Sequence, residues 1–221
     1  MKLSFEAIIK FTCGLLLVGL LLFLPAGALA YTGGLLLLGL LFVPMLIAGF
    51  VMLAKNPEFL KKRLDAKEKQ GTQKGVVAFS GLMFIAGFVV AGLDYRFGWS
   101  QMPTWVVTVA SVLFLVAYAL YAEVMRENAY LSRTIKVEEG QTVVDTGLYG
   151  IVRHPMYAVT LLLFLMMPLV LGSWYALIVF GFYPVIIIVR LKDEEILLTR
   201  ELPGYEAYKQ KVKYRLIPFI W

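Results

Sequence analysis

The stretch from Thr146 to Tyr157 holds the residues best suited to chemistry, because it contains His154, the only histidine of the chain. Arg153 and Pro155 flank this histidine, and tyrosines stand on either side of the three. An imidazole beside a guanidinium and phenols can bind a charged ligand or move a proton near neutral pH. A structural interpretation also remains open, in which Pro155 starts a helix and Tyr157 anchors it at a membrane interface.

A second charged group, made of Arg190, Glu194 and Glu195, follows the histidine across an apolar run that ends at Val189. The run is interrupted at residues 172–174 and is too long for one helix, so it predicts a hairpin of two short helices of about 16 residues each. Because a hairpin returns the chain to its starting face, the two charged groups should meet. If the second helix continues past Val189, Arg190 and Glu194 share a helix face. The alternative is an arginine that reaches for the interface beside a solvated acidic cluster.

Other catalytic templates are absent from the sequence. There is no Gly-x-Gly-x-x-Gly, no Walker-type Gly-Lys-Ser/Thr, no His-Glu-x-x-His and no Gly-x-Ser-x-Gly. One histidine cannot build a multi-histidine metal site, and the lone Cys13 has no partner for a disulfide or a metal, so we expect no metal. The remaining set suits a charged cosubstrate that binds beside a lipophilic substrate.

The composition predicts an all-α, polytopic membrane helix bundle, since 60% of the residues are hydrophobic and 16% are charged. We expect about six membrane segments, of which the last two form the short hairpin. The first four are expected at residues 11–24, 33–54, 76–93 and 104–121. The first resembles a signal peptide, with Ala28-Leu29-Ala30 as a possible cleavage site, but we expect it to remain as a membrane helix.

The chain divides by character into two regions. Residues 1–125 are expected to form the N-terminal transmembrane helices, with a basic cytosolic loop at 55–75 that includes a short amphipathic interfacial helix at 57–68. Residues 126–221 are expected to form the catalytic region, with a cosubstrate-binding loop, the hairpin and a cytosolic C-terminal helical cap. The cap should hold a helix, a break at 202–204 and a second short helix.

The distribution of basic residues predicts the orientation. With six spans both termini lie on one side, and that side collects 20 of the 21 lysines and arginines, leaving only Arg96 on the other. The positive-inside rule then places both termini, Arg153 and His154 in or at the cytoplasm. The net charge of +6 fits contact with anionic membrane lipids, and no basic stripe interleaved with aromatics points to nucleic acid.

The motifs together resemble a known family. They are Gly147-x-Tyr149, Arg153-His154-Pro155-x-Tyr157, Arg190-x-x-x-Glu194-Glu195, Gly204-Tyr205-x-x-Tyr208 and the closing Arg215-Leu-Ile-Pro218-Phe. This series is similar to that of the isoprenylcysteine carboxyl methyltransferase and phospholipid methyltransferase superfamily. The resemblance covers roughly Gln141 to Trp221, whereas residues 1–120 match only as generic membrane helices.

The resemblance implies a pocket for S-adenosyl-L-methionine without a Rossmann domain, with S-adenosyl-L-homocysteine as the product. The residues that it places around the cosubstrate are Gln141, Thr142, Val143, Val144, Tyr149, His154, Pro155, Met156, Tyr157 and Glu194. It makes Arg190 the contact for a substrate carboxylate, with Glu195 beside it, and Arg190 and Glu194 the catalytic pair. Tyr205 and Tyr208 match the family's tail, and Ala158 departs from the glycine that many members carry there.

We therefore expect a membrane methyltransferase that acts on an isoprenylcysteine-like carboxylate or a lipid head group held by Arg190. Its partners would be a lipophilic substrate and membrane lipids, without nucleic acid or an obligatory protein partner, and its location a bacterial inner membrane. Two alternatives stay open. An NADPH-dependent sterol-type reductase shares similar tyrosines and a comparable His-Pro element, and a non-enzymatic membrane scaffold would use only the basic face.

Overall fold

The protein is an all-helical bundle in the computed structural model, which describes residues 2–64, 71–132, 134–135 and 137–221. The helices are α1 (Lys2–Ala26), α2 (Thr32–Lys55), α3 (Pro57–Leu64), α4 (Gly71–Phe97), α5 (Thr104–Glu127), α6 (Pro155–Val170), α7 (Trp174–Phe180), α8 (Tyr183–Glu201) and α9 (Tyr205–Lys211), with a 3-10 turn, η1, at Gly147–Gly150. Among the described residues, five helical stretches are long and apolar enough to cross a membrane, namely α1, α2, α4, α5 and the joined α7 and α8. The shorter apolar α6 completes the predicted polytopic membrane bundle, which is confirmed.

Several helices extend further than the hydropathy predicted. For the hairpin, about 16 residues were predicted in each arm. The first arm, α6, has this length, but the prediction is wrong for the second arm, because α7 and α8 together cover the 28 residues Trp174–Glu201. The segment after Val189 is rich in Leu, Glu, Lys and Arg, which favour helix, so the chain stays helical as it leaves the lipid. For the same reason α4 and α5 run beyond their apolar cores. The interfacial helix is present as Pro57–Leu64, and its predicted end at 65–68 lies outside the described residues.

The core of the bundle is aromatic and tightly packed. The ring of Phe84 on α4 lies 4.8 Å from that of Phe164 on α6 and 5.4 Å from that of Phe180 on α7. Helix α4 also approaches α1 closely, because a Cβ built on Gly92 would meet the carbonyl oxygen of Leu22 at 2.5 Å. Without a hydrophobic drive between helices in lipid, such close contacts of small and interlocking side chains hold the bundle together.

A buried carboxylate joins two turns at the end of the bundle away from the charged motifs. Asp94 is 2% exposed and accepts hydrogen bonds from the Ser100 amide and hydroxyl, each at 2.6 Å, and from the Ser173 hydroxyl. Ser173 in turn caps α7 by accepting from the Ala176 amide at 3.0 Å. Asp94 therefore lies inside α4, beyond residue 93 where this membrane span was predicted to end, and that predicted end is wrong.

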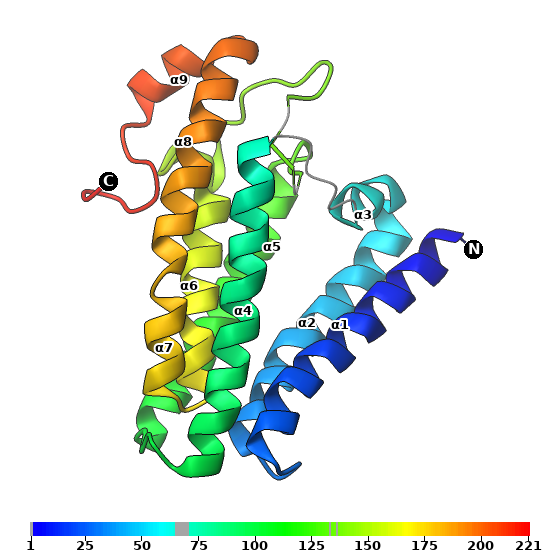
Figure 1. The fold of residues 1–221 in the computed structure, drawn as a ribbon. Helices are drawn as coiled ribbons and strands as arrows, with labels where there is room; N and C mark the ends of the chain where they lie inside the picture. Colours follow the sequence, from blue (N-terminus) through cyan, green and yellow to red (C-terminus); the bar gives the residue numbers. More distant parts are fainter. Residues whose placement is uncertain (1, 65–70, 133, 136) are drawn as a thin grey trace.

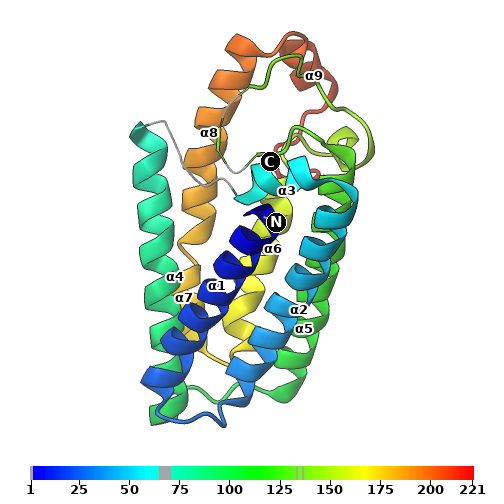
Figure 2. The same cartoon turned by 90° about the vertical axis from the view of Figure 1, so that its right-hand side faces the viewer.

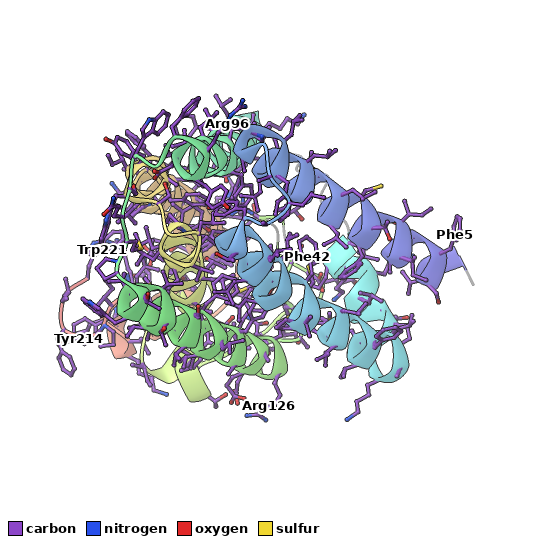
Figure 3. The ribbon with its side chains drawn as sticks, turned by 90° about the horizontal axis from the view of Figure 1, so that it is seen from below. Phe5, Phe42, Arg96, Arg126, Tyr214 and Trp221 are labelled. Carbon is purple, nitrogen blue, oxygen red and sulfur yellow. The ribbon has the colours of Figure 1, made fainter. Side chains whose placement is uncertain are left out.

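Helix α9, the C-terminal segment and most long connections lie toward one end of the molecule. Figure 1 shows α3 in the same half, and the N-terminus below it near mid-height, because α1 and α2 lean away from the other helices. Figure 2 gives the same arrangement from the side, with α6 enclosed by its neighbours. In the view along the bundle, Phe5 at the start of α1 lies far from Tyr214 and Trp221, which lie on the opposite side (Figure 3). The helices thus gather the charged motifs at one end.

Candidate cosubstrate and substrate site

The tail of the chain fixes the turn that presents His154. The Arg153 and His154 amides donate to the carbonyl oxygens of Tyr214 and Arg215, each at 2.9 Å. His154 is the N-cap residue of α6 and Pro155 is its first residue, where a proline costs no hydrogen bond. The predicted helix start at Pro155 is therefore present. The turn is held from outside by a segment just over sixty residues further along the chain.

A cavity of about 370 Å³ opens at this end of the bundle, between α4, α5, α6, α8, α9 and the loop that follows α5. Residues predicted for the site that line it are Gln141, Thr142, Val143, Val144, Tyr149, His154, Met156, Tyr157, Arg190 and Glu194. Pro155 and Glu195 are not among the lining residues. The structure therefore brings together most of the residues that the motifs singled out, from four separate parts of the sequence.

The cavity changes character with depth. Near the charged end its wall carries Arg63, Asn128, Tyr149 and Glu194, while Phe164, Tyr183, Ile186 and Ile187 line it along α6 and α8. Phe164 stands nine residues beyond the start of α6, which is about 13 Å along a helix. The cavity thus joins a polar compartment to an apolar one inside the membrane-spanning part of the bundle.

Arg190, Tyr157 and Glu194 form one hydrogen-bonded group on the cavity wall. Arg190 Nε donates to the Tyr157 hydroxyl at 3.2 Å, and that hydroxyl donates to Glu194 Oε2. Arg190 and Glu194 are four residues apart on α8, so they share one face of this helix, as predicted for a helix that continues past Val189. A guanidinium and a carboxylate are therefore held side by side, with a phenol between them.

Glu195 has a different place from its neighbour. Its side chain is 9% exposed, and its oxygens accept from Arg153 Nε at 2.7 Å and Arg215 Nε at 2.9 Å. His154 Nε2 approaches the same carboxylate at 3.3 Å. Successive residues of a helix point about 100° apart, so one of the pair faces the cavity while the other faces the tail. Glu195 joins α8, the start of α6 and the tail, and its predicted contact with a substrate stays a prediction without support from this placement.

His154 is more constrained than a free ligand-binding imidazole. Its Nε2 atom lies 3.3 Å from Glu195 and 3.4 Å from the Tyr205 hydroxyl, and its ring stacks on Tyr157 with centroids 5.7 Å apart. The side chain is buried, yet it lines the cavity. His154 therefore connects the buried ionic network to the wall of the site.

The tyrosines of the charged end are neutral hydrogen-bonding groups. Asn128 Nδ2 donates to the Tyr149 hydroxyl at 2.9 Å, and the Tyr208 hydroxyl donates to the Tyr149 carbonyl oxygen at 2.7 Å. Burial raises the pKa of Tyr149 to about 12 and raises the pKa values of Tyr205 and Tyr208 above their ordinary value. These phenols stay protonated at any working pH, and two of them, Tyr205 and Tyr208, close the cavity as the C-terminal motif suggested.

Sequence reasoning missed three polar residues of this site. Gln73 at the start of α4 is fully buried; its Oε1 accepts from Arg190 Nη1 at 3.3 Å and its Nε2 donates to Asp193 Oδ2 at 2.7 Å. Arg63 of α3 and Asn128 after α5 line the cavity. Gln73 could have been noticed in the sequence as a lone amide side chain just before an apolar span. Nothing in the local sequence distinguishes Arg63 or Asn128 as site residues. Among the described residues, no three His, Cys, Asp or Glu side chains gather as a metal site would require.

Comparison with known proteins bears on this region of the chain. Residues 104–200 match the sequence model of the isoprenylcysteine carboxyl methyltransferase (ICMT) family. The match confirms the resemblance where the two ranges overlap, at 141–200, and extends it back over α5, whereas the tail motifs at 204–218 lie outside it. The chain is also 30% identical over 96 residues to the uncharacterized protein YpbQ of Bacillus subtilis (strain 168). That similarity covers 43% of this chain and 57% of YpbQ, so the chain spans little more than half of its relative's length.

Proposed function

We propose that this chain, whose residues 104–200 match the ICMT family, is a membrane methyltransferase that uses S-adenosyl-L-methionine and a lipophilic acceptor. The observation that carries the proposal is the two-part cavity. Its polar end faces the side of the molecule that holds both termini, and its apolar part extends between membrane-length helices. A water-soluble donor and a membrane-dissolved acceptor would reach it from different phases.

The residues present fit the proposed cosubstrate. Its amino-acid part carries a carboxylate and an ammonium, and the lining includes arginines and the carboxylate of Glu194. Its adenosine part needs an apolar wall with hydrogen-bonding groups at the edge, which Tyr149, Met156 and the extended segment 141–144 provide. The volume of about 370 Å³ lies within the range of small-molecule sites.

The chemistry places modest demands on the protein. When bound, the donor supplies a sulfonium methyl group, so an acceptor oxygen forms the new C–O bond while the S–C bond breaks and its electron pair passes to sulfur. The chain must hold the acceptor in line and exclude water. A guanidinium binds a carboxylate through two parallel hydrogen bonds, so Arg190 would orient an ionised acceptor without any base. For a lipid amine, Glu194 is the lining carboxylate placed to remove a proton.

The division of roles follows from these contacts. Glu194 would face the positive part of the donor, while His154 would contact the donor's carboxylate or ribose, and Arg190 would hold the acceptor, an isoprenylcysteine-like carboxylate or an anionic lipid head group. Since 20 of the 21 basic residues belong to the segments expected on the side of the termini, we place this side in the cytoplasm, as in a bacterial inner membrane.

Calorimetry on the full chain in detergent tests the donor class. We expect S-adenosylhomocysteine to bind and NADPH not to bind. Glu194→Gln should weaken the binding of S-adenosylhomocysteine by about tenfold or more, since a hydrogen bond to a charged group is lost, whereas Glu201→Gln, an exposed acidic control on the same helix, should leave it unchanged. Binding of NADPH alone would indicate a reductase instead.

A further inference from the structure

Helix α3 is held against the polar end of the bundle rather than lying loosely on the membrane. Asn56 Oδ1 accepts from the Phe59 amide at 3.1 Å, and the Phe59 and Leu60 side chains are buried. Lys62 Nζ lies 2.5 Å from Glu138 Oε2 in the loop that follows α5. Figures 1 and 2 show α3 at the same end as α9 and the C-terminus. The orientation of α3 is therefore set by the burial of Phe59 and Leu60 and by the ion pair of Lys62 with Glu138.

This orientation brings Arg63 to the cavity. Its guanidinium donates to the Tyr121 hydroxyl on α5 and lies over the Tyr121 ring, with 5.6 Å from Cζ to the ring centroid. Both side chains line the cavity. Within the described ranges, no carboxylate forms an ion pair with Arg63, and its hydrogen-bond partner is neutral. An arginine held by a phenol in this way keeps donors available for an anion.

The other cations of the cavity have different tasks. Arg153 is taken up by Glu195 and by the carbonyl oxygens of Val212 and Lys213, at 2.9 and 3.0 Å. Arg190 is assigned to the acceptor and contacts Tyr157 and Gln73. Arg63 lies on a different element, α3, and has a different hydrogen-bond partner, so it can serve a second anionic group without competing for the acceptor.

The charges of Arg63 and Glu194 both influence the same side chain of the cavity wall, the phenol of Tyr149. The Tyr149 pKa is raised mainly by burial, then lowered by the Asn128 hydrogen bond, raised by the Glu194 carboxylate and lowered by the Arg63 guanidinium. Both charges therefore lie within Coulombic range of the same phenol, one of each sign. A zwitterion placed beside Tyr149 would meet a cation and an anion together.

We propose that Arg63 binds the carboxylate of the donor's amino-acid part, with Glu194 facing its ammonium group. This inference rests on the proposed function. It gives α3, in the basic loop between α2 and α4, a role in ligand recognition in addition to the contact with anionic lipids that its charge predicts. It also fixes the direction of the donor in the cavity, since the amino-acid end would lie toward α3.

Two ligands that differ in the amino-acid part test the proposal on the full chain in detergent. S-adenosylhomocysteine carries the carboxylate, and 5′-methylthioadenosine lacks it. We expect Arg63→Gln to weaken the first by about tenfold to 100-fold, as for a lost charge-assisted pair, and to leave the second unchanged. Arg63→Lys should give an intermediate loss, because an ammonium cannot bind a carboxylate as a fork. Lys61→Gln, an exposed neighbour with the same charge change, is the matched control.

The outcomes separate the inference from the proposed function. If the wild-type chain binds neither ligand, the proposed function fails. If the wild type binds S-adenosylhomocysteine and Arg63→Gln loses both ligands equally, or loses neither, the assignment of Arg63 is wrong while the function stands. Retained binding of 5′-methylthioadenosine in the variant also shows that the adenosine part of the site is still folded.

Discussion

At the scale of residues, the site depends on which polar side chains tertiary contacts turn inward. Glu194 and Glu195 are adjacent and chemically identical, yet one lines the cavity and the other is buried among Arg153, His154 and Arg215. Helical geometry predicts that neighbours face different sides, but not which of the two faces the site. Only the packing of the tail against α8 decides that.

Gln73 is expected to position Arg190. A glutamine offers one acceptor and one donor in the same plane, which matches Arg190 on one side and Asp193 on the other. Gln73→Leu removes both bonds, so the guanidinium should become more mobile. We expect phenylglyoxal to modify Arg190 faster in this variant, relative to the exposed Arg200, as measured by peptide mass spectrometry.

The control for this prediction is Gln101→Leu, a change of the same kind at an exposed residue near the far end of the bundle. It should leave the ratio of modification rates at its wild-type value. An unchanged ratio in Gln73→Leu would mean that the amide does not restrain Arg190. Binding of S-adenosylhomocysteine should be equal in the wild type and both variants, since Gln73 contacts no residue assigned to the donor.

At the scale of elements, the buried carboxylate of Glu195 holds three segments together. Glu195→Gln would leave the guanidinium groups of Arg153 and Arg215 without their counter-charge, and breaking a buried ion pair costs about 3–5 kcal/mol. We expect a lower midpoint of thermal unfolding, followed by tryptophan fluorescence in detergent. Glu194→Gln is the matched control, because it is the same change one residue earlier and faces the cavity.

The two variants should give opposite patterns. Glu194→Gln should keep the unfolding midpoint and lose affinity for the donor, while Glu195→Gln should lose stability, with any loss of affinity following from it. If Glu195→Gln were as stable as the wild type, the carboxylate would not hold the tail, and a direct role toward substrate would regain support.

The elements themselves follow largely from hydropathy. The apolar runs at 33–54, 76–93 and 104–121 predicted membrane helices because each is near the length that lipid requires. The helix ends were misjudged at α1, α4, α5 and α8, since hydropathy reports where lipid contact ends and helix propensity carries the helix further. The C-terminal helical cap is present as predicted: the end of α8 is its first helix, the break follows at 202–204, and α9 is its second short helix. The Gly204 backbone, at φ +85°, explains why a glycine stands at that break.

The site was predicted less completely, for a physical reason. Motif residues such as Tyr149, Tyr157 and Arg190 were found because their spacing resembles that of a family. Arg63 and Gln73 lie outside the matched region 104–200, in a part of the chain that was predicted as a basic loop with a short interfacial helix. Arg63, which is half-buried, bonds to α5, and Gln73, which is buried, bonds to α8. A local pattern does not encode partners so distant in sequence.

At the scale of the whole molecule, one end of the bundle holds the charged motifs, while the other holds only a few charged residues, among them Asp94 and Arg96. Helix α9 and the C-terminal segment lie toward one end (Figure 1), where the cavity opens, and the buried Asp94 cluster lies near the other. Helices α1 and α2 lean away from the rest toward the charged end. The asymmetry fits a molecule that takes one reactant from water and the other from lipid.

Transfer of a labelled methyl group tests the central claim most directly. The full chain in detergent would be given S-adenosylmethionine labelled in its methyl group and, as acceptors, an N-acyl S-farnesylcysteine or a total lipid extract. We expect label in the organic phase, released by alkali if the acceptor is a carboxylate. Arg190→Ala should lower the rate by at least about tenfold, as for a lost charge-assisted pair, without loss of donor affinity. Donor binding without transfer of label to either acceptor preparation would contradict the account.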